Sequence, residues 1–131
     1  MKTLPIRLTP GQDLRAALEA AVLAQNCRAA FVLSGIGSLS TAGIRLAGAA
    51  QPTRLTESME ILTLSGTVAA DGGKTGSHMH MAISTATGQV LGGHVAPGCI
   101  VLTTAEVLLA LLPAWQFTRE PDAGTGYDEL V

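Results

Sequence analysis

Hydrophobic and polar residues alternate along much of this chain, and this pattern predicts β-strands over most of its length. Glycines near residues 35–37 indicate a turn between two strands, and DGGKTGS (71–77) has the composition of a loop. The apolar run 99–112 begins with β-branched residues, which favour a strand over a helix there. We expect WQFTRE (115–120) to close the sheet. The other predicted strands are KTLPIRL (2–8), RAAFVLSGIGSL (28–39), TAGIRLAG (41–48), MEILTLSGTV (59–68), HMHMAIS (78–84) and QVLGGHV (89–95).

One segment near the N-terminus has helical spacing instead. The stretch TPGQ supplies Thr9 as an N-cap, Pro10 at the first helical position and Gln12 for a capping box, and the pattern ends near 25–27. A single helix followed by many strands predicts an α+β fold with a largely antiparallel sheet. The apolar positions of the predicted helix are Leu14, Ala17, Leu18, Ala21 and Val22.

A length of 131 residues predicts one compact domain, which we assign to 1–119, followed by an acidic, flexible tail at 120–131. The N-terminus lacks the apolar run of a signal peptide, and the run 99–112 is shorter than the roughly 20 residues that a membrane helix needs. Cys27 and Cys99 have no CxxC spacing, so we interpret them as buried thiols. These features predict a cytoplasmic protein without a membrane span.

The balance of charge constrains the partners of this chain. Only 14% of the residues are charged and 47% are hydrophobic, whereas a soluble domain carries about 25% charged residues. So few charges cannot cover a whole monomer surface, and we expect the chain to associate with copies of itself. The net charge of −2, without a basic stripe, argues against direct DNA binding by this chain alone.

The three histidines of the chain, His78, His80 and His94, all lie between residues 78 and 94. In a strand, His78 and His80 share one face. A three-residue loop at 86–88 pairs residue 85 with residue 89 and places His80 opposite His94, with apolar residues paired on the other face. Directly opposed residues have Cβ atoms about 4.5–5.5 Å apart, which is close enough for two imidazoles to share a metal ion. The weak point of this register is a bulge at Gly92-Gly93.

Three neutral imidazoles suit Zn²⁺, and also Ni²⁺, Fe²⁺ or Cu²⁺, and they leave a fourth coordination position open. The alternative is that the histidines lie on a polar strand face or at a subunit contact. The cupin fold also uses an HxH motif, but its acidic ligand would fall near Ser84 or Thr85, and neither residue is acidic. For catalysis, Glu60 and Glu106 are weak candidates for a general base, because hydrogen-bonded or interface glutamates are more common in such strands.

Four motifs resemble the plant-and-prokaryote-conserved (PPC) domain, with HMHMAISTATGQVLGGHV as the most specific one. Thr87-Gly88 replaces the acidic-Gly turn usual there, and Met59 stands where the family generally has Phe. The resemblance implies a compact α+β fold, a homotrimer and, as in some prokaryotic members, a metal held by the histidine cluster. The motifs are LSGIGSLSTAGIRL (33–46), MEILTLSGTV (59–68), HMHMAISTATGQVLGGHV (78–95) and GCIVLTTAEV (98–107).

Two classes of function remain open at this point. The family's DNA-binding label comes largely from plant relatives with AT-hooks, and the sequence has no Arg-Gly-Arg-Pro hook. The first class is a DNA-associated or regulatory binding protein that presents the surface of a homotrimer to DNA or a protein partner. The second is a zinc-dependent hydrolase or lyase that acts on a small molecule at the histidine site. We favour the first class.

Overall fold

Six antiparallel strands form one sheet, in the order β1-β6-β2-β3-β4-β5. The computed structural model describes residues 1–70 and 76–131. Most of the predicted loop at 71–77 therefore lies outside the described residues. The α+β class and the antiparallel sheet with one helix are confirmed, and the run 99–112 forms a strand. The elements are β1 Lys2–Leu8, α1 Leu14–Ala24, β2 Ala29–Arg45, β3 Thr53–Ala69, β4 His78–Thr85, β5 Val90–Val95 and β6 Ile100–Leu111.

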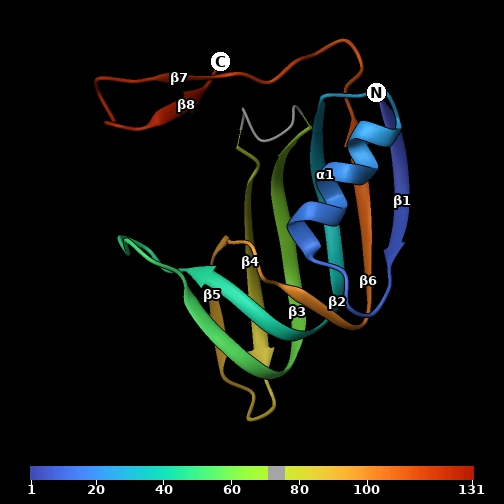
Figure 1. The fold of residues 1–131 in the computed structure, drawn as a ribbon, viewed down its shortest axis with the longest axis vertical. Helices are drawn as coiled ribbons and strands as arrows, with labels where there is room; N and C mark the ends of the chain where they lie inside the picture. The colour runs from blue at the N-terminus through green and yellow to red at the C-terminus, as the bar shows by residue number, and fades with distance from the viewer. Residues whose placement is uncertain (71–75) are drawn as a thin grey trace.

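The C-terminal end of β2 closes the sheet on itself. There, Ile44 pairs with Thr53 of β3 and also with Val95 of β5. Strands β2 to β5 consequently curl into a partly closed barrel, and α1 lies across the sheet on the side of β1, β2 and β6 (Figure 1). This closure brings the end of β5 next to the end of β2, and it thereby places His94 beside Arg45.

Strand β2 is one continuous strand of 17 residues, so the predicted turn near residues 35–37 was wrong. Its glycines allow close approach of neighbouring strands. A Cβ atom on Gly37 would lie 2.4 Å from the carbonyl oxygen of Thr104 on β6. The chain therefore needs glycine here to pack two strands tightly, and the strand continues past it.

Helix α1 packs its apolar side into the core through Leu14, Leu18 and Val22, which are all fully buried. The predicted N-cap at Thr9 was wrong. Instead, the backbone N–H of Thr9 donates to the side-chain oxygen of Gln12 at 2.8 Å, which makes this segment a turn before the helix.

Asp13 is the N-cap that the structure uses. One of its carboxylate oxygens accepts from the N–H of Ala16 at 3.0 Å, and the other accepts from the N–H of Gly98 at 2.7 Å. A side chain that satisfies a free helix N–H stabilises the first turn. The same carboxylate fastens the start of α1 to the loop before β6.

The C-terminal segment does not close the main sheet, contrary to the prediction for WQFTRE. Strands β7 (Arg119–Pro121) and β8 (Asp128–Leu130) pair with each other as a separate two-stranded sheet. This hairpin extends away from the main sheet at the red end of the chain (Figure 1). Residues 112–118 connect β6 to it without regular strand structure. In the part of the chain that the structure describes, no helix is long and apolar enough to cross a membrane.

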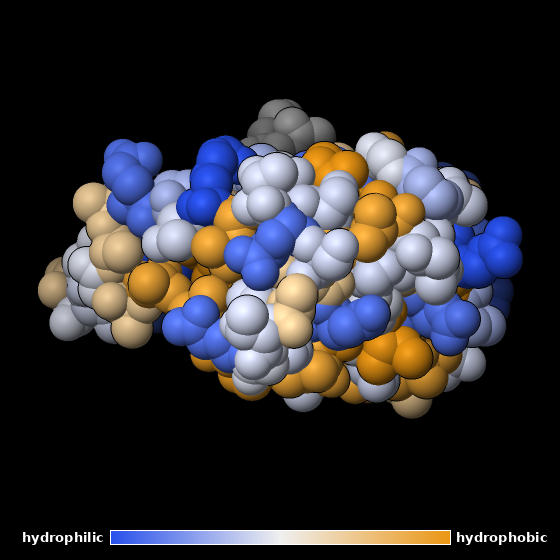
Figure 2. Space-filling view, turned by 90° about the horizontal axis from the view of Figure 1, so that it is seen from below, coloured by the Kyte–Doolittle hydropathy of each residue, from blue (hydrophilic) through white to orange (hydrophobic). Residues whose placement is uncertain are grey.

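Several large hydrophobic side chains are exposed on the strands of the main sheet. Ile36 of β2, for example, is 55% exposed. Figure 2 shows hydrophobic residues at the surface, interspersed with hydrophilic ones. Isolated exposed apolar residues are ordinary, but several on neighbouring strands suit a contact surface. Those on β2, β3 and β6 are Phe31, Leu33, Ile36, Leu62 and Leu102.

Candidate metal centre

The β4–β5 hairpin has the predicted turn. The N–H of Thr85 donates to the carbonyl of Gln89 at 2.8 Å, and the N–H of Gly88 donates to the carbonyl of Thr85 at 2.9 Å. Gly88 has a φ of 81°, in the left-handed region that favours glycine. The three-residue loop and its register are therefore confirmed.

The pairing continues from the turn to the histidines without a register shift. Ile83 lies opposite Leu91, and His80 lies opposite His94. No bulge at Gly92-Gly93 interrupts the pairing of these two strands, so the weak point of the predicted register does not disturb it. Residues on β4 alternate between exposed and buried, with His78 and His80 exposed. The buried hydrophobic residues of β4 are Met79, Met81 and Ile83.

Gly93 allows strand β5 to lie close to strand β2 beside the histidines. A Cβ atom at this position would lie 2.6 Å from the carbonyl oxygen of Arg45. Only glycine lets β5 approach β2 so closely, and the next residue, His94, pairs with Arg45. Gly93 thus supports the strand closure that sets His94 beside an arginine.

The three imidazoles converge on one point. The Nε2 atoms of His78 and His80 are 3.1 Å apart, and Nε2 of His80 is 3.1 Å from Nδ1 of His94. All three donor atoms lie within 4.8 Å of one another. A tetrahedral zinc ion with Zn–N bonds of about 2.0–2.1 Å needs nitrogens about 3.3 Å apart. The spacing fits one ion bound by three imidazoles, with a fourth position open.

Hydrogen bonding alone does not satisfy this cluster. Nε2 of His80 is close to a nitrogen of each of the other two histidines. A neutral imidazole nitrogen carries either one proton or one lone pair, so Nε2 of His80 can make one of these hydrogen bonds well, but not both. A cation between the rings would accept all three lone pairs.

The environment keeps two of the imidazoles neutral. Burial lowers the pKa of His78 below its usual 6.5, and positive charge on His80, Arg119 and Arg45 lowers it further, although Glu129 opposes this. Burial also lowers the pKa of His94, as do Arg45 and the other two histidines. Because a metal binds only the neutral imidazole, both shifts favour metal binding at neutral pH.

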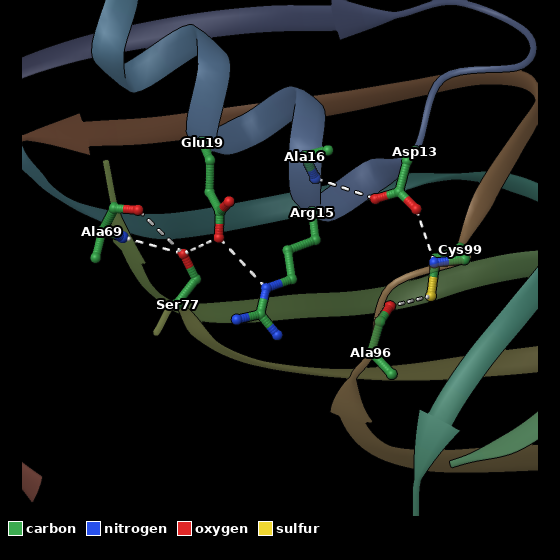
Figure 3. A network of polar contacts seen from close by, with 9 residues as sticks. Asp13, Arg15, Ala16, Glu19, Ala69, Ser77, Ala96 and Cys99 are labelled. Carbon is green, nitrogen blue, oxygen red and sulfur yellow. Dashed lines mark hydrogen bonds and ion pairs between the residues drawn. The ribbon is translucent and has the colours of Figure 1, made fainter. Parts of the chain in front are cut away.

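A polar network fastens helix α1 to the start of β4 (Figure 3). The Ser77 hydroxyl donates to Oε1 of Glu19 at 2.7 Å and accepts from the N–H of Ala69 at 3.1 Å. Nε of Arg15 donates to the same Glu19 oxygen at 3.3 Å. Since Ser77 directly precedes His78, this network positions the first histidine and brings Arg15 to the same end of the molecule.

A pocket of about 760 Å³ opens beside the histidines and is lined by His78 and His94. Its walls come from α1, from the ends of β2, β4 and β5, and from the β7–β8 hairpin. Sequence reasoning identified the histidines but missed the charged walls, which come from distant parts of the chain. The charged lining residues are Arg15, Arg45, Arg119, Asp128 and Glu129.

The two glutamates considered as general bases lie away from this pocket. Glu60 pairs with Ser84 on β4, four residues from His80, which is roughly 13 Å along a strand. Glu106 is on β6, three strands from β4 in the sheet order. Neither glutamate lines the pocket, and among the described residues the candidate metal ligands comprise only the three histidines.

Comparison with known proteins supports the fold. "Bifunctional protein GlmU" of Synechococcus sp. (strain JA-2-3B'a(2-13)) is 48% identical over 130 residues, or 99% of this chain. The chain spans about a fifth of the length of that relative, since the match covers 20% of it. A hypothetical protein from Salmonella cholerae-suis is 42% identical, with a TM-score of 0.91 over 99% of this chain and 91% of its own.

Two further solved structures are more distant. A metal-containing protein from Archaeoglobus fulgidus is 27% identical, with a TM-score of 0.78 over 100% of this chain and 94% of its own. A candidate DNA-binding protein from Bacteroides thetaiotaomicron shares the fold at 17% identity, with a TM-score of 0.85 over 98% of this chain and 91% of its own.

The motifs of the sequence and the fold agree with a family assignment. The sequence profile of the Plants and Prokaryotes Conserved (PCC) domain matches residues 1–113, which include the helix, the whole main sheet and the three histidines. The resemblance to the plant-and-prokaryote-conserved domain is therefore confirmed. This chain belongs to the Plants and Prokaryotes Conserved domain family.

Proposed function

We propose that this protein binds one divalent transition metal ion per chain through His78, His80 and His94. The observation that carries the proposal is the convergence of three ring nitrogens, with two separations of 3.1 Å that meet at His80. The metal-containing relative from Archaeoglobus fulgidus supports it. Zinc is our first choice, because neutral imidazoles suit it and it accepts three protein ligands with one open position.

We propose further that the protein acts as a homotrimer. The low charge fraction and the exposed apolar residues of β2, β3 and β6 support self-association. Light scattering at micromolar concentration should give three times the 13.4 kDa mass of the chain. A monomer mass would contradict the proposal and leave the exposed apolar residues unexplained.

A DNA-associated or regulatory role is the function that we propose for the trimer. It is supported by the family assignment and by the candidate DNA-binding protein of the same fold. Direct contact with DNA should nevertheless be weak, because phosphate contacts need clustered cations and this chain has a net charge of −2. Fluorescence anisotropy with duplex DNA at physiological salt tests this. Nanomolar, sequence-selective binding would contradict weak binding, whereas binding only through a partner protein would support a regulatory role.

A zinc-dependent hydrolase or lyase is the second candidate, favoured by the open ligand position beside a pocket of small-molecule size. When bound, the ion would supply Lewis-acid chemistry. Asp128 and Glu129 are the carboxylates that line this pocket, and they replace Glu60 and Glu106 as the groups to test for proton transfer. A cytoplasmic location fits both candidates, since Cys27 and Cys99 are free and buried.

The decisive experiment is a calorimetric titration of metal-stripped protein with zinc, combined with elemental analysis of protein purified without added metal. We expect one zinc ion per chain. A titration without binding would overturn the proposed metal centre. Binding that survives simultaneous His78→Ala and His94→Ala substitutions would overturn the assignment of the ligands.

A further inference from the structure

The arginines of this chain are distributed unevenly over its surface. Three of them, Arg15, Arg45 and Arg119, line the pocket beside the histidines, and each is half-buried. The other lysine and arginine residues that the structure describes are exposed and lie outside the pocket lining. These exposed residues are Lys2, Arg7, Arg28 and Arg54. Partial burial of a charged side chain is costly, so three at one site require an explanation.

Contacts within the protein use only a small part of what these guanidinium groups offer. Arg15 donates through Nε to Glu19 at 3.3 Å, and Arg45 donates to the carbonyl of Ala49 at 3.2 Å. Over residues 1–70 and 76–131, neither Arg45 nor Arg119 forms an ion pair with a carboxylate. Each guanidinium has five N–H donors, so most of the donors at this site remain for a ligand.

The arginines are also close enough to influence the histidines. After burial, Arg45 is the strongest cause of the lowered pKa of His94. Arg119 likewise contributes to the lowered pKa of His78, after burial and His80. Arg45 and His94 are paired residues of β2 and β5. Two arginines therefore lie near the proposed metal site.

The lining also carries negative charge, from Asp128 and Glu129 of the β7–β8 hairpin, and both residues are exposed. Arg45 and Arg119 match these two carboxylates in number, and Arg15 is paired with Glu19. A divalent ion on the histidines would add positive charge, so the electrostatic balance of the pocket would then favour an anion.

We propose that this pocket binds a small organic oxyanion, a carboxylate or a phosphate, through Arg45 and Arg119, with Arg15 at its edge. A volume of about 760 Å³ is that of a small-molecule site. Guanidinium groups match the two oxygens of a carboxylate or phosphate, and such charge-assisted hydrogen bonds are strong. We further expect a second group of the same molecule to occupy the open position on the metal ion. This part of the inference rests on the proposed metal site.

The test is isothermal titration calorimetry at constant ionic strength, with inorganic phosphate and succinate as separate probes. Both metal-stripped and zinc-loaded protein are titrated. We expect saturable binding of at least one probe to both forms, and tighter binding to the zinc-loaded form. The probe that binds more tightly identifies whether phosphate or carboxylate is the preferred class.

The arginine variants give the specific test. Arg45→Gln and Arg119→Gln should each weaken binding of the preferred probe about tenfold, the loss expected for one charge-assisted hydrogen bond. Arg28→Gln removes the same charge from an exposed position outside the pocket and should leave affinity unchanged. Thermal melting of each variant checks that the fold is retained, and Arg119 lies on a hairpin outside the main sheet.

The outcomes separate the two proposals. If zinc does not bind but the arginine variants still weaken anion binding to stripped protein, the metal site fails and the anion pocket stands. If zinc binds but neither arginine variant changes anion affinity, or Arg28→Gln weakens it equally, the anion pocket is wrong. Displacement of the probe by duplex DNA at equal phosphate concentration would also contradict a small-molecule ligand.

Discussion

The β4–β5 hairpin and the β7–β8 hairpin both line the pocket, but only the first belongs to the six-stranded sheet. On β4, Met79, Met81 and Ile83 are buried in the core beneath the histidines. Strands β7 and β8 pair only with each other, and β8 is exposed throughout. An isolated two-stranded hairpin is marginally stable. The contrast indicates that the core supports the three histidines directly, whereas the part of the pocket wall formed by β7 and β8 lies outside the main sheet.

The largest effect should come from the core face of the first hairpin. Ile83 is completely buried, so Ile83→Ala should lower the free energy of unfolding by about 2–5 kcal/mol. Leu130 on β8 is 41% exposed, and Leu130→Ala should change it by less than about 0.5 kcal/mol. Urea unfolding at one fixed protein concentration measures both. Equal losses would show that the second hairpin is as firmly packed as the first.

The next effect concerns the ligand face of β4 and β5. His94→Ala should weaken zinc binding by more than the roughly 10- to 100-fold that loss of an outer-shell partner costs, while the fold persists. Ser84→Ala, on the same face of β4 but next to Glu60, should leave zinc affinity unchanged. Calorimetry on metal-stripped protein measures both. Wild-type affinity in His94→Ala would show that the three histidines are not one site.

A smaller effect is expected from pH. Because the pKa values of His78 and His94 lie below 6.5, both imidazoles are neutral at pH 7, and zinc affinity should be nearly constant above that pH. As pH falls through these pKa values, protons compete for the ligand nitrogens. Affinity should therefore begin to drop below pH 6.5, by about tenfold for each pH unit below the pKa of a ligand. Titrations from pH 7 down to the lowest pH at which the protein stays folded test it, and equal affinity at both ends of this range would mean that the histidines are not the ligands.

The smallest global effect is expected in the second hairpin. The side chain of Asp122 accepts hydrogen bonds from the N–H groups of Gly124 and Thr125, at 2.7 and 3.1 Å. Asp122→Ala should loosen this turn, yet lower the free energy of unfolding by less than about 0.5 kcal/mol. Amide hydrogen exchange at Gly126 should become faster, with no change in β4. Faster exchange in both hairpins would show that they are coupled.

The register of the β4–β5 hairpin could be predicted because its information is local. A strand has a period of two, and a slip by one residue would turn Ile83 and its neighbours toward solvent, so the hydrophobic pattern selects one pairing. Together with a turn that ends at Gly88, this was enough to place His80 opposite His94. The core face and the ligand face of the hairpin thus followed from the same few residues.

Other features could not be predicted because they depend on distant partners. In the sequence, the glycines of β2 resemble turn residues. The structure shows instead that the backbone of β6 packs directly against Gly37. Asp13 became the N-cap because its second oxygen also accepts from the N–H of Gly98, on a loop far along the chain. The arginines of the pocket lie on α1, β2 and β7, and only tertiary packing brings them to the histidines.

The spacing of the histidines along the chain has a consequence for the order of assembly. His80 and His94 are only 14 residues apart and meet as soon as one hairpin closes, a process of microseconds. Arg15 and Arg119, in contrast, meet only after nearly the whole chain has been made and folded, since the cost of closing a loop grows with its length. A nascent chain would thus bring two of the proposed metal ligands together before the proposed anion site exists, and a bound ion would then favour the native pairing of β4 and β5 over competing registers.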